Sequence, residues 1–223
     1  RYAGTARELR SSGVNAVYGG NPVMDLIEDE KAPDDLWRGE GEKIILLPGS
    51  RPRAYEDAKL VLNAAAELAG RVRCSFAMVP APTIDIAKLV GSLEGWSVAE
   101  DEKGITSGGV YVRIYNGQVA SAARDADLLI GLGGTANQLC AGLGVPVVSI
   151  IEKGKLRQKK LLREAEVLVK PDAKELANAA ERILASPDLR QEMGEAGIRR
   201  LGGMGALDKL VAYCADELGW DNR

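Results

Sequence analysis

Apolar residues occur in short, dense runs that are separated by longer amphipathic stretches along most of the chain. The runs are rich in Val, Ile and Leu and do not alternate strictly with polar residues, which is typical of parallel strands covered on both faces. They predict strands at Asn15–Tyr18, Lys43–Leu47, Val72–Val79, Val110–Tyr115, Leu128–Ile130, Val147–Ile150 and Val167–Val169. Helical spacing predicts helices at Tyr55–Leu68, Gln118–Ala126, Ala136–Leu143 and Lys174–Ala185. This alternation indicates an α/β fold with a doubly wound parallel sheet.

The two ends of the pattern suggest how the chain is divided. Residues 1–27 carry a short helical stretch and a turn-rich joint, and we interpret them as the tail of an N-terminal domain with its crossing segment. Residues 28–42 are polar and predict a linker, and residues 43–223 predict one Rossmann-like unit. Glu100–Gly109, acidic and then glycine-rich, predicts a loop or hairpin tip. Because the first residue is Arg1 rather than Met, we expect a piece of a longer protein.

Composition excludes several function classes. With 46% hydrophobic and 27% charged residues, the chain has a globular composition. Its net charge of -3 argues against nucleic acid as a partner, because a phosphate-tracking surface needs a basic excess. The absence of histidine excludes His-based acid–base catalysis on this chain and most zinc chemistry, and no metal or cofactor motif appears.

Cysteine usage and hydropathy indicate the compartment. Three widely spaced cysteines, Cys74, Cys140 and Cys214, are interpreted as buried thiols in a reducing environment. No apolar run reaches the length of about 18 residues that a membrane span needs, and no signal peptide opens the chain. We therefore expect a cytoplasmic location, with membrane-peripheral attachment left open.

Two loops at predicted strand ends carry candidate chemistry, since ligands of open α/β sheets bind beyond the carboxyl ends of strands. In the first loop, Gly49 allows close backbone approach, Ser50 offers a hydroxyl and Arg51 offers a guanidinium for phosphate or carboxylate. The alternative for this loop is an ordinary turn with a helix-capping serine.

The second loop runs from Gly131 to Asn137 at a predicted strand-to-helix turn. Its glycines leave backbone N–H groups free at a helix N-terminus, which suits a phosphate. It is neither a Walker A loop, because no Gly-Lys-Ser/Thr follows, nor the dinucleotide fingerprint, because the third spaced glycine is absent. The alternative is that these glycines are required only sterically.

A third segment, Lys153–Arg163, has six cations in eleven residues and predicts a solvated helix face, with contact to a diphosphate or an anionic membrane surface as the alternative.

Several motifs in order resemble one family. They are Tyr18–Asp25, Leu46–Arg51, Ala126–Gly131, Gly134–Asn137 and Gly142–Val147. Over residues 18–205 the chain resembles the carboxy-terminal half of lipid-A-disaccharide synthase, in its synthase-related branch. These are GT-B glycosyltransferases, similar in plan to the peptidoglycan transferase that uses UDP-N-acetylglucosamine. The resemblance implies a donor-binding GT-B C-terminal domain.

The resemblance also implies roles for individual residues. Gly49, Ser50 and Arg51 would line the donor cleft. The diphosphate would lie on Gly133, Gly134, Thr135 and Ala136, and the base near Ile114, Tyr115 and Asn116. Gln158 would match a glutamine of the synthase pattern. The family usually has an acidic residue for the ribose hydroxyls after Gly-Thr-Ala, whereas this chain has Asn137, Gln138 and Leu139 there, and a neutral acceptor binds hydroxyls less strongly than a carboxylate.

These observations predict the donor-binding half of an inverting glycosyltransferase that uses a UDP-sugar, of the UDP-N-acetylglucosamine type, as substrate and no cofactor. The half with the acceptor site and catalytic base is missing, so this chain should bind without turnover, and no catalytic residue is assigned. A lipid or membrane-surface acceptor is compatible with the family. Two alternatives stay open: half of a sugar-nucleotide epimerase, and a non-catalytic nucleotide-, anion- or protein-binding module.

Overall fold

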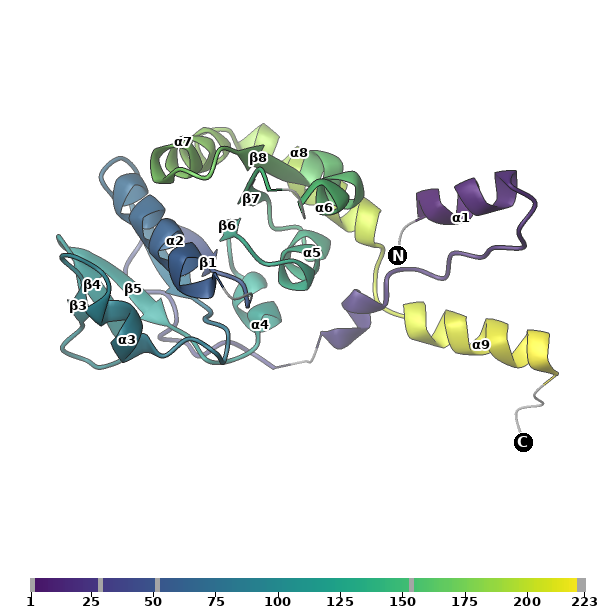
Figure 1. Ribbon diagram of the computed structural model, residues 1–223, viewed down its shortest axis with the longest axis horizontal. Helices are drawn as coiled ribbons and strands as arrows, with labels where there is room; N and C mark the ends of the chain where they lie inside the picture. Colours follow the sequence, from purple (N-terminus) through teal and green to yellow (C-terminus); the bar gives the residue numbers. More distant parts are fainter. Residues whose placement is uncertain (1–2, 28–29, 51–52, 153–154, 220–223) are drawn as a thin grey trace.

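The fold is a twisted α/β sheet with helices on both faces (Figure 1). The computed structural model describes residues 3–27, 30–50, 53–152 and 155–219. The strands are β1 (Glu42–Leu47), β2 (Cys74–Met78), β3 (Ser97–Val98), β4 (Gly104–Ser107), β5 (Val110–Ile114), β6 (Leu128–Gly131), β7 (Val147–Ile150) and β8 (Glu166–Val169). Their order is β3-β4-β5-β2-β1-β6-β7-β8, and the pairing is parallel except that β4 is antiparallel to both β3 and β5.

The strand order locates the point at which a ligand is expected. From β1 the chain adds β2 and β5 on one side, and then β6, β7 and β8 on the other. This is the order of nucleotide-binding doubly wound folds, and the crevice opens where the direction of winding reverses. Here the reversal lies between β1 and β6, which pair in parallel from Ile44 opposite Leu128 to Leu47 opposite Gly131.

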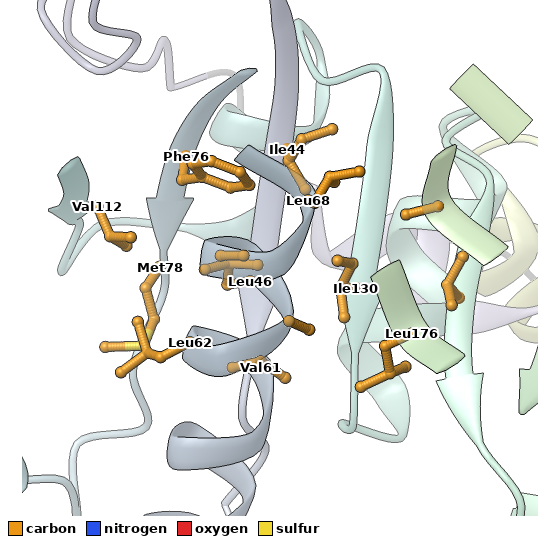
Figure 2. Close-up of a cluster of buried hydrophobic side chains, with 14 of the residues drawn as sticks. Ile44, Leu46, Val61, Leu62, Leu68, Phe76, Met78, Val112, Ile130 and Leu176 are labelled. Atoms are coloured by element: carbon orange, nitrogen blue, oxygen red, sulfur yellow. The ribbon is translucent and has the colours of Figure 1, made fainter. Parts of the chain in front are cut away.

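Different sets of helices cover the two faces of the sheet. They are α1 (Ala3–Ser11), α2 (Ala54–Ala69), α3 (Ile86–Gly91), α4 (Val119–Ala123), α5 (Thr135–Gly142), α6 (Lys155–Leu162), α7 (Ala173–Leu184), α8 (Pro187–Leu201) and α9 (Ala206–Leu218), with 3₁₀ turns η1 (Pro22–Leu26) and η2 (Arg163–Ala165). On one face, α2 and α7 pack on the sheet, and Figure 2 shows Val61, Leu62 and Leu68 of α2 beside side chains of β1 and β2. On the other face, α4, α5 and α6 enclose a second, alanine-rich cluster.

The predicted fold class is confirmed, and most predicted elements are present. The β7 strand has the predicted bounds, and β1, β2, β5, β6 and β8 differ from prediction only at their ends. The predicted strand at Asn15–Tyr18 is wrong, because residues 14–20 form no regular element. A strand needs a neighbouring strand, but this segment lies along α9, where a Cβ on Gly20 would stand 2.8 Å from that of Ala206.

Two other expectations need correction. The segment Glu100–Gly109 does form a hairpin tip, but β4 occupies part of it. The prediction of three buried thiols is wrong for Cys214, which is exposed on α9, whereas Cys140 is buried and Cys74 is partly buried. The pattern on α9 is amphipathic, but among its residues only Ala206 is buried in this structure. Cys214 therefore has no core to enter.

The predicted linker is fixed on the domain. Residues 30–41 form no helix or strand, yet Leu36 is fully buried beneath the second face of the sheet. Asp35 accepts a hydrogen bond from the Lys103 ammonium at 2.7 Å, and the Arg38 guanidinium lies 4.5 Å from the centre of the Tyr111 ring. The segment is thus a strap across the β4–β5 hairpin.

Helices α1 and α9 lie at one end of the molecule, away from the sheet (Figure 1). Asp25 in η1 caps α9, accepting hydrogen bonds from the backbone N–H groups of Gly205 and, at 2.8 Å, Leu207. A Cβ on Gly19 would lie 3.3 Å from the Leu210 side chain of α9. Segments from both ends of the sequence are therefore joined beyond the sheet.

Candidate functional site

The two candidate loops meet at the carboxyl edge of the sheet, between β1 and β6. The Leu132 backbone N–H, just after β6, donates to the Leu47 carbonyl at 2.7 Å. Gly49 has φ +84°, and a Cβ there would lie 3.3 Å from the Leu132 carbonyl oxygen. A side chain at position 49 would be strained and would press on the second loop. The structure thus brings the two loops together at the topological switch point.

The glycine turn after β6 is held from within. The Asn137 amide nitrogen and the Ser149 hydroxyl both donate to the Gly131 carbonyl, at 2.7 and 2.6 Å. A Cβ on Gly131 would lie 2.5 Å from the Asn137 Oδ1 atom, and one on Gly133 would lie 3.2 Å from it. These two glycines are therefore required by packing against Asn137.

Gly134 differs from its neighbours. Its φ is −106°, and a Cβ added there would meet nothing within 4 Å. No contact within the described residues requires glycine at this position, so packing does not account for it. It is the N-cap of α5, whose first residue Thr135 is exposed. The first N–H groups of an α-helix have no partner within the helix and carry the positive end of its dipole. The turn can therefore accept an anion that approaches closely over Gly134.

A charged group that sequence reasoning missed lies at the same edge. Arg53, the residue before α2, forms ion pairs with Glu152 at 3.7 Å and with Asp57 at 3.6 Å. Its side chain is 58% exposed, so a ligand can reach it. Glu152 lies two residues after the end of β7. The signal available in the sequence is that residues following parallel strands gather at one edge.

The residues predicted to hold a base line a cavity at the end of β5. Its volume is about 490 Å³, and it is lined by Ile114, Tyr115 and Asn116 together with Pro33 of the strap. The Tyr115 N–H donates to the Met78 carbonyl at 2.9 Å, which fixes this backbone to β2. The cavity therefore has one wall from the sheet and one from the strap.

Arg113 closes one side of this cavity and joins it to the strap. Its guanidinium donates to the Lys103 carbonyl at 3.0 Å and lies 3.5 Å from the Asp35 carboxylate. The hydrogen bond from Lys103, supported by the charges of Lys103 and Arg113, lowers the pKa of Asp35. The carboxylate is thus ionised at neutral pH and holds both cations at the cavity wall.

Other predicted site residues are placed elsewhere or lie outside the described residues. Asn137 is fully buried and Gln138 is 8% exposed, so neither is available on the surface of the turn. Gln158 on α6 donates to the Glu166 carboxylate, at the amino end of β8, and is not brought together with the glycine turn. Ser50 is exposed in the first loop, Ala136 is half-buried in the first turn of α5, and Arg51 lies outside the described residues.

The cationic segment before β8 is partly structural. The Lys159 ammonium donates to the Arg163 carbonyl at 2.5 Å and to the Glu166 carbonyl, and burial lowers its pKa. Lys160 is exposed. Where side chains are described, the segment therefore combines a solvated face with internal bonds.

A larger cavity of about 930 Å³ lies at the opposite, amino edge of the sheet, beside Cys74, Tyr111 and Arg38. Topology favours the carboxyl edge as the ligand site, because strand ends and helix N-termini converge there. In the part of the chain that the structure describes, no three His, Cys, Asp or Glu side chains gather as a metal site would require. No described helix has the length and apolar character to cross a bilayer.

Comparisons with known proteins agree with this architecture. Residues 108–204 match the family described as "Protein of unknown function (DUF354)", and no curated protein matches the chain. A putative UDP-N-acetylglucosamine 2-epimerase from Listeria monocytogenes is similar over 100% of this chain and 59% of its own, at 14% identity and a TM-score of 0.72. The S. aureus MnaA–UDP co-structure is similar over 100% of this chain and 60% of its own, at 13% identity and 0.69.

A glycosyltransferase is also similar in structure. SnogD from Streptomyces nogalater is similar over 93% of this chain and 62% of its own, at 16% identity and a TM-score of 0.53. The chain thus spans about 60% of the length of these proteins. The likeness shows the Rossmann-like fold that GT-B glycosyltransferases and UDP-N-acetylglucosamine 2-epimerases share. The finer resemblance to lipid-A-disaccharide synthase stays a prediction.

Proposed function

We propose that this chain is the sugar-nucleotide-binding half of a GT-B enzyme, with a UDP-sugar of the UDP-N-acetylglucosamine type as its ligand. The observation that carries this proposal is the meeting of the two loops at the β1–β6 switch point, where Leu132 donates to the Leu47 carbonyl. Around this point lie the helix N-terminus at Gly134, the exposed Arg53 side chain and, at the end of β5, a cavity of about 490 Å³. Each suits one part of a nucleotide diphosphate.

The diphosphate would bind over Gly134 and Thr135, where backbone N–H groups at the start of α5 can donate to its oxygens. Arg53 would add a positive charge, and the sequence adds Arg51 two residues earlier. The base would enter the cavity beside Ile114 and Asn116. Binding therefore rests on backbone donors and cations.

In a transferase of this kind, the reaction releases the nucleotide diphosphate, and negative charge grows on its leaving oxygen. Pre-arranged N–H groups and guanidinium groups stabilise that charge without having to reorganise. The chain spans about 60% of the length of the similar structures, and we propose that the acceptor site and the general base belong to another half. The resemblance suggests an inverting glycosyltransferase with a lipid or membrane-surface acceptor as the first candidate, in which the two halves position the reactants.

An epimerase half is the second candidate. The Listeria monocytogenes UDP-N-acetylglucosamine 2-epimerase structure is similar over the whole chain with a TM-score of 0.72, compared with 0.53 for the glycosyltransferase SnogD. Glu152 at the carboxyl edge would offer a carboxylate for proton transfer. The same nucleotide site serves both candidates, and they differ in what the other half contributes.

The missing half would pack on the end of the molecule that carries α1 and α9. Val14 and Val17 are about half exposed there, and Val211 on α9 is 67% exposed. Exposed apolar side chains on these elements favour a protein contact. This surface lies beyond the sheet, on elements from both ends of the sequence.

The first test is a thermal-shift and calorimetric panel on this chain with UDP, UDP-N-acetylglucosamine, UDP-glucose, ADP and NAD. A ligand at a hundred times its Kd stabilises by about 2.7 kcal/mol, which raises Tm by a few degrees. We expect uridine nucleotides alone to give this shift. Equal shifts with all five compounds, or none with any, would contradict the proposal for this chain and would favour an anion-binding or interaction module.

The second test separates the two enzymatic candidates in the full-length gene product. With UDP-N-acetylglucosamine and no acceptor, an epimerase changes the configuration of the sugar, which proton NMR detects as new anomeric signals. A transferase leaves the sugar unchanged until an acceptor is supplied. Epimerised sugar would therefore replace the first candidate by the second.

A further inference from the structure

One peptide group in the candidate site is fixed from three directions. The Gly131 carbonyl accepts from the Asn137 amide at 2.7 Å and from the Ser149 hydroxyl at 2.6 Å. On the other side of the same peptide, the Leu132 N–H donates to the Leu47 carbonyl at 2.7 Å. A peptide group is planar, so bonds at both of its ends fix its orientation. The 131–132 peptide therefore ties β6 to α5, to β7 and to β1.

The two side chains that donate to the Gly131 carbonyl are polar and yet buried. Asn137 and Ser149 are both fully buried. A carbonyl oxygen has two lone pairs, and both can be used here by side chains. A buried polar side chain costs free energy unless it is hydrogen-bonded, so these donors are tolerated because of the bond that they share.

Asn137 keeps its position although half of its amide is unsatisfied. Its Oδ1 atom has no hydrogen-bond partner among the described residues, and an unpaired buried acceptor is destabilising. The residue is the third of α5, and from this position a side chain reaches back over the N-cap. Here it reaches past Gly134 to the strand end, so the turn 132–134 is closed by a side-chain bond.

We propose that Asn137 and Ser149 are positioning residues for the diphosphate. They hold the Gly131 carbonyl inward, and the backbone of the following turn therefore presents its N–H groups outward at the start of α5. This inference rests on the proposed function, and it gives Asn137 a role through the backbone in place of the direct ligand contact that its sequence position suggested.

The test compares three variants of the whole chain. Asn137→Ala removes the donor from α5, and Ser149→Ala removes the donor from β7. Ser121→Ala is the matched control, because Ser121 is also buried and its hydroxyl has no partner among the described residues. Calorimetry or saturation-transfer NMR measures the affinity of each variant for UDP and for uridine, which lacks the diphosphate. The Ser149 variant keeps the test informative if the Asn137 variant does not fold.

A positioning role predicts a split between the two ligands. Affinity for UDP should fall about tenfold in the Asn137 and Ser149 variants, because a charge-assisted hydrogen bond to the diphosphate is weakened, whereas affinity for uridine should stay within about twofold. Ser121→Ala should change neither. Equal losses for UDP and uridine in folded variants, or no loss for UDP, would overturn the proposal, because general destabilisation does not discriminate between the ligands.

Amide hydrogen exchange separates this inference from the proposed function. The Leu132 amide should exchange faster in the Asn137 and Ser149 variants than in the wild type, relative to amides at the centre of β1, with no ligand present. If the wild type binds no uridine nucleotide, the proposed function fails. In that case faster Leu132 exchange would still support the fixed peptide, and unchanged exchange would reject it.

Discussion

The Arg53 guanidinium lies 3.7 Å from the Glu152 carboxylate, across the carboxyl edge of the sheet. One residue precedes α2 and the other follows β7, so the pair spans the edge on both sides of the β1–β6 switch point. The arginine is more exposed than its partner, at 58% against 31%. The pair therefore presents a positive group toward solvent at the place where a diphosphate would bind.

Arg53→Ala should weaken UDP binding with little change in stability. Exposed ion pairs contribute about 0–1 kcal/mol to folding, so the urea midpoint should hardly move. UDP affinity should fall about threefold to tenfold and should become less sensitive to salt, since one cation has been removed. Glu152→Gln should raise UDP affinity, because a carboxylate near the phosphates is neutralised. Calorimetry at two salt concentrations should show a lower UDP affinity for Arg53→Ala and a higher one for Glu152→Gln than for the wild type. A change in the same direction for both variants would contradict the placement of the diphosphate beside this ion pair.

The glycines of the turn should separate stability from binding. Gly131→Ala places a methyl group 2.5 Å from the Asn137 Oδ1 atom and should destabilise the fold by about 1–3 kcal/mol. Gly134→Ala has open space and a φ of −106°, so its cost is limited to the weaker N-capping by Ala, about 0.5–1 kcal/mol. Its methyl group should instead obstruct the diphosphate and weaken UDP binding.

Gly203→Ala is the control for this pair, because its added Cβ would also meet nothing within 4 Å and it lies in the turn before α9. Urea denaturation and UDP titration of the three variants give the comparison. Unchanged UDP affinity in the Gly134 variant would show that nothing approaches the turn at that point.

The sequence predicted this turn but not the reason for each glycine. Dense Val, Ile and Leu runs identify buried parallel strands, which is why β7 and the two loops at strand ends could be predicted. The inward position of the Asn137 side chain could not be predicted, because only the folded turn between β6 and α5 brings its amide within 2.7 Å of the Gly131 carbonyl. The pairing of Arg53 with Glu152, about a hundred residues apart, could not be predicted either, since charged residues after strands are common. The strand predicted at Asn15–Tyr18 was wrong because an apolar run does not show whether a neighbouring strand is present to pair with it.

The cysteines should differ sharply in reactivity. Burial raises the pKa of both Cys74 and Cys140 to about 12, so at pH 8 almost none of either is the reactive thiolate. Cys214 is exposed on α9. We expect a thiol reagent at pH 8 to modify one cysteine per native chain, and Cys214→Ser to abolish the reaction. Rapid modification of Cys140 in the native protein would contradict its burial.

The same pKa values imply a direction for stability at alkaline pH. Thiols with a raised pKa in the folded state contribute stability below the unfolded value, near 9, and this contribution is lost as pH rises toward 12. The urea midpoint should therefore fall above pH 9. Cys140→Ala should reduce that alkaline fall while lowering stability at pH 7 through lost packing, which denaturation at the two pH values measures.

Asp25 should control the attachment of α9. Its carboxylate accepts from the N–H groups of Gly205 and Leu207, and among the residues of α9 only Ala206 is buried. Little packing therefore supports the helix, and loss of such a cap costs about 1 kcal/mol. Asp25→Ala should speed amide exchange along α9 about fivefold, whereas exchange in β1 and α2 should be unchanged, because the domain core does not involve this bond.

The control variant is Asp216→Ala, because Asp216 is an exposed acid near the far end of α9. Equal exchange in wild type and the Asp25 variant would mean that other contacts hold the helix.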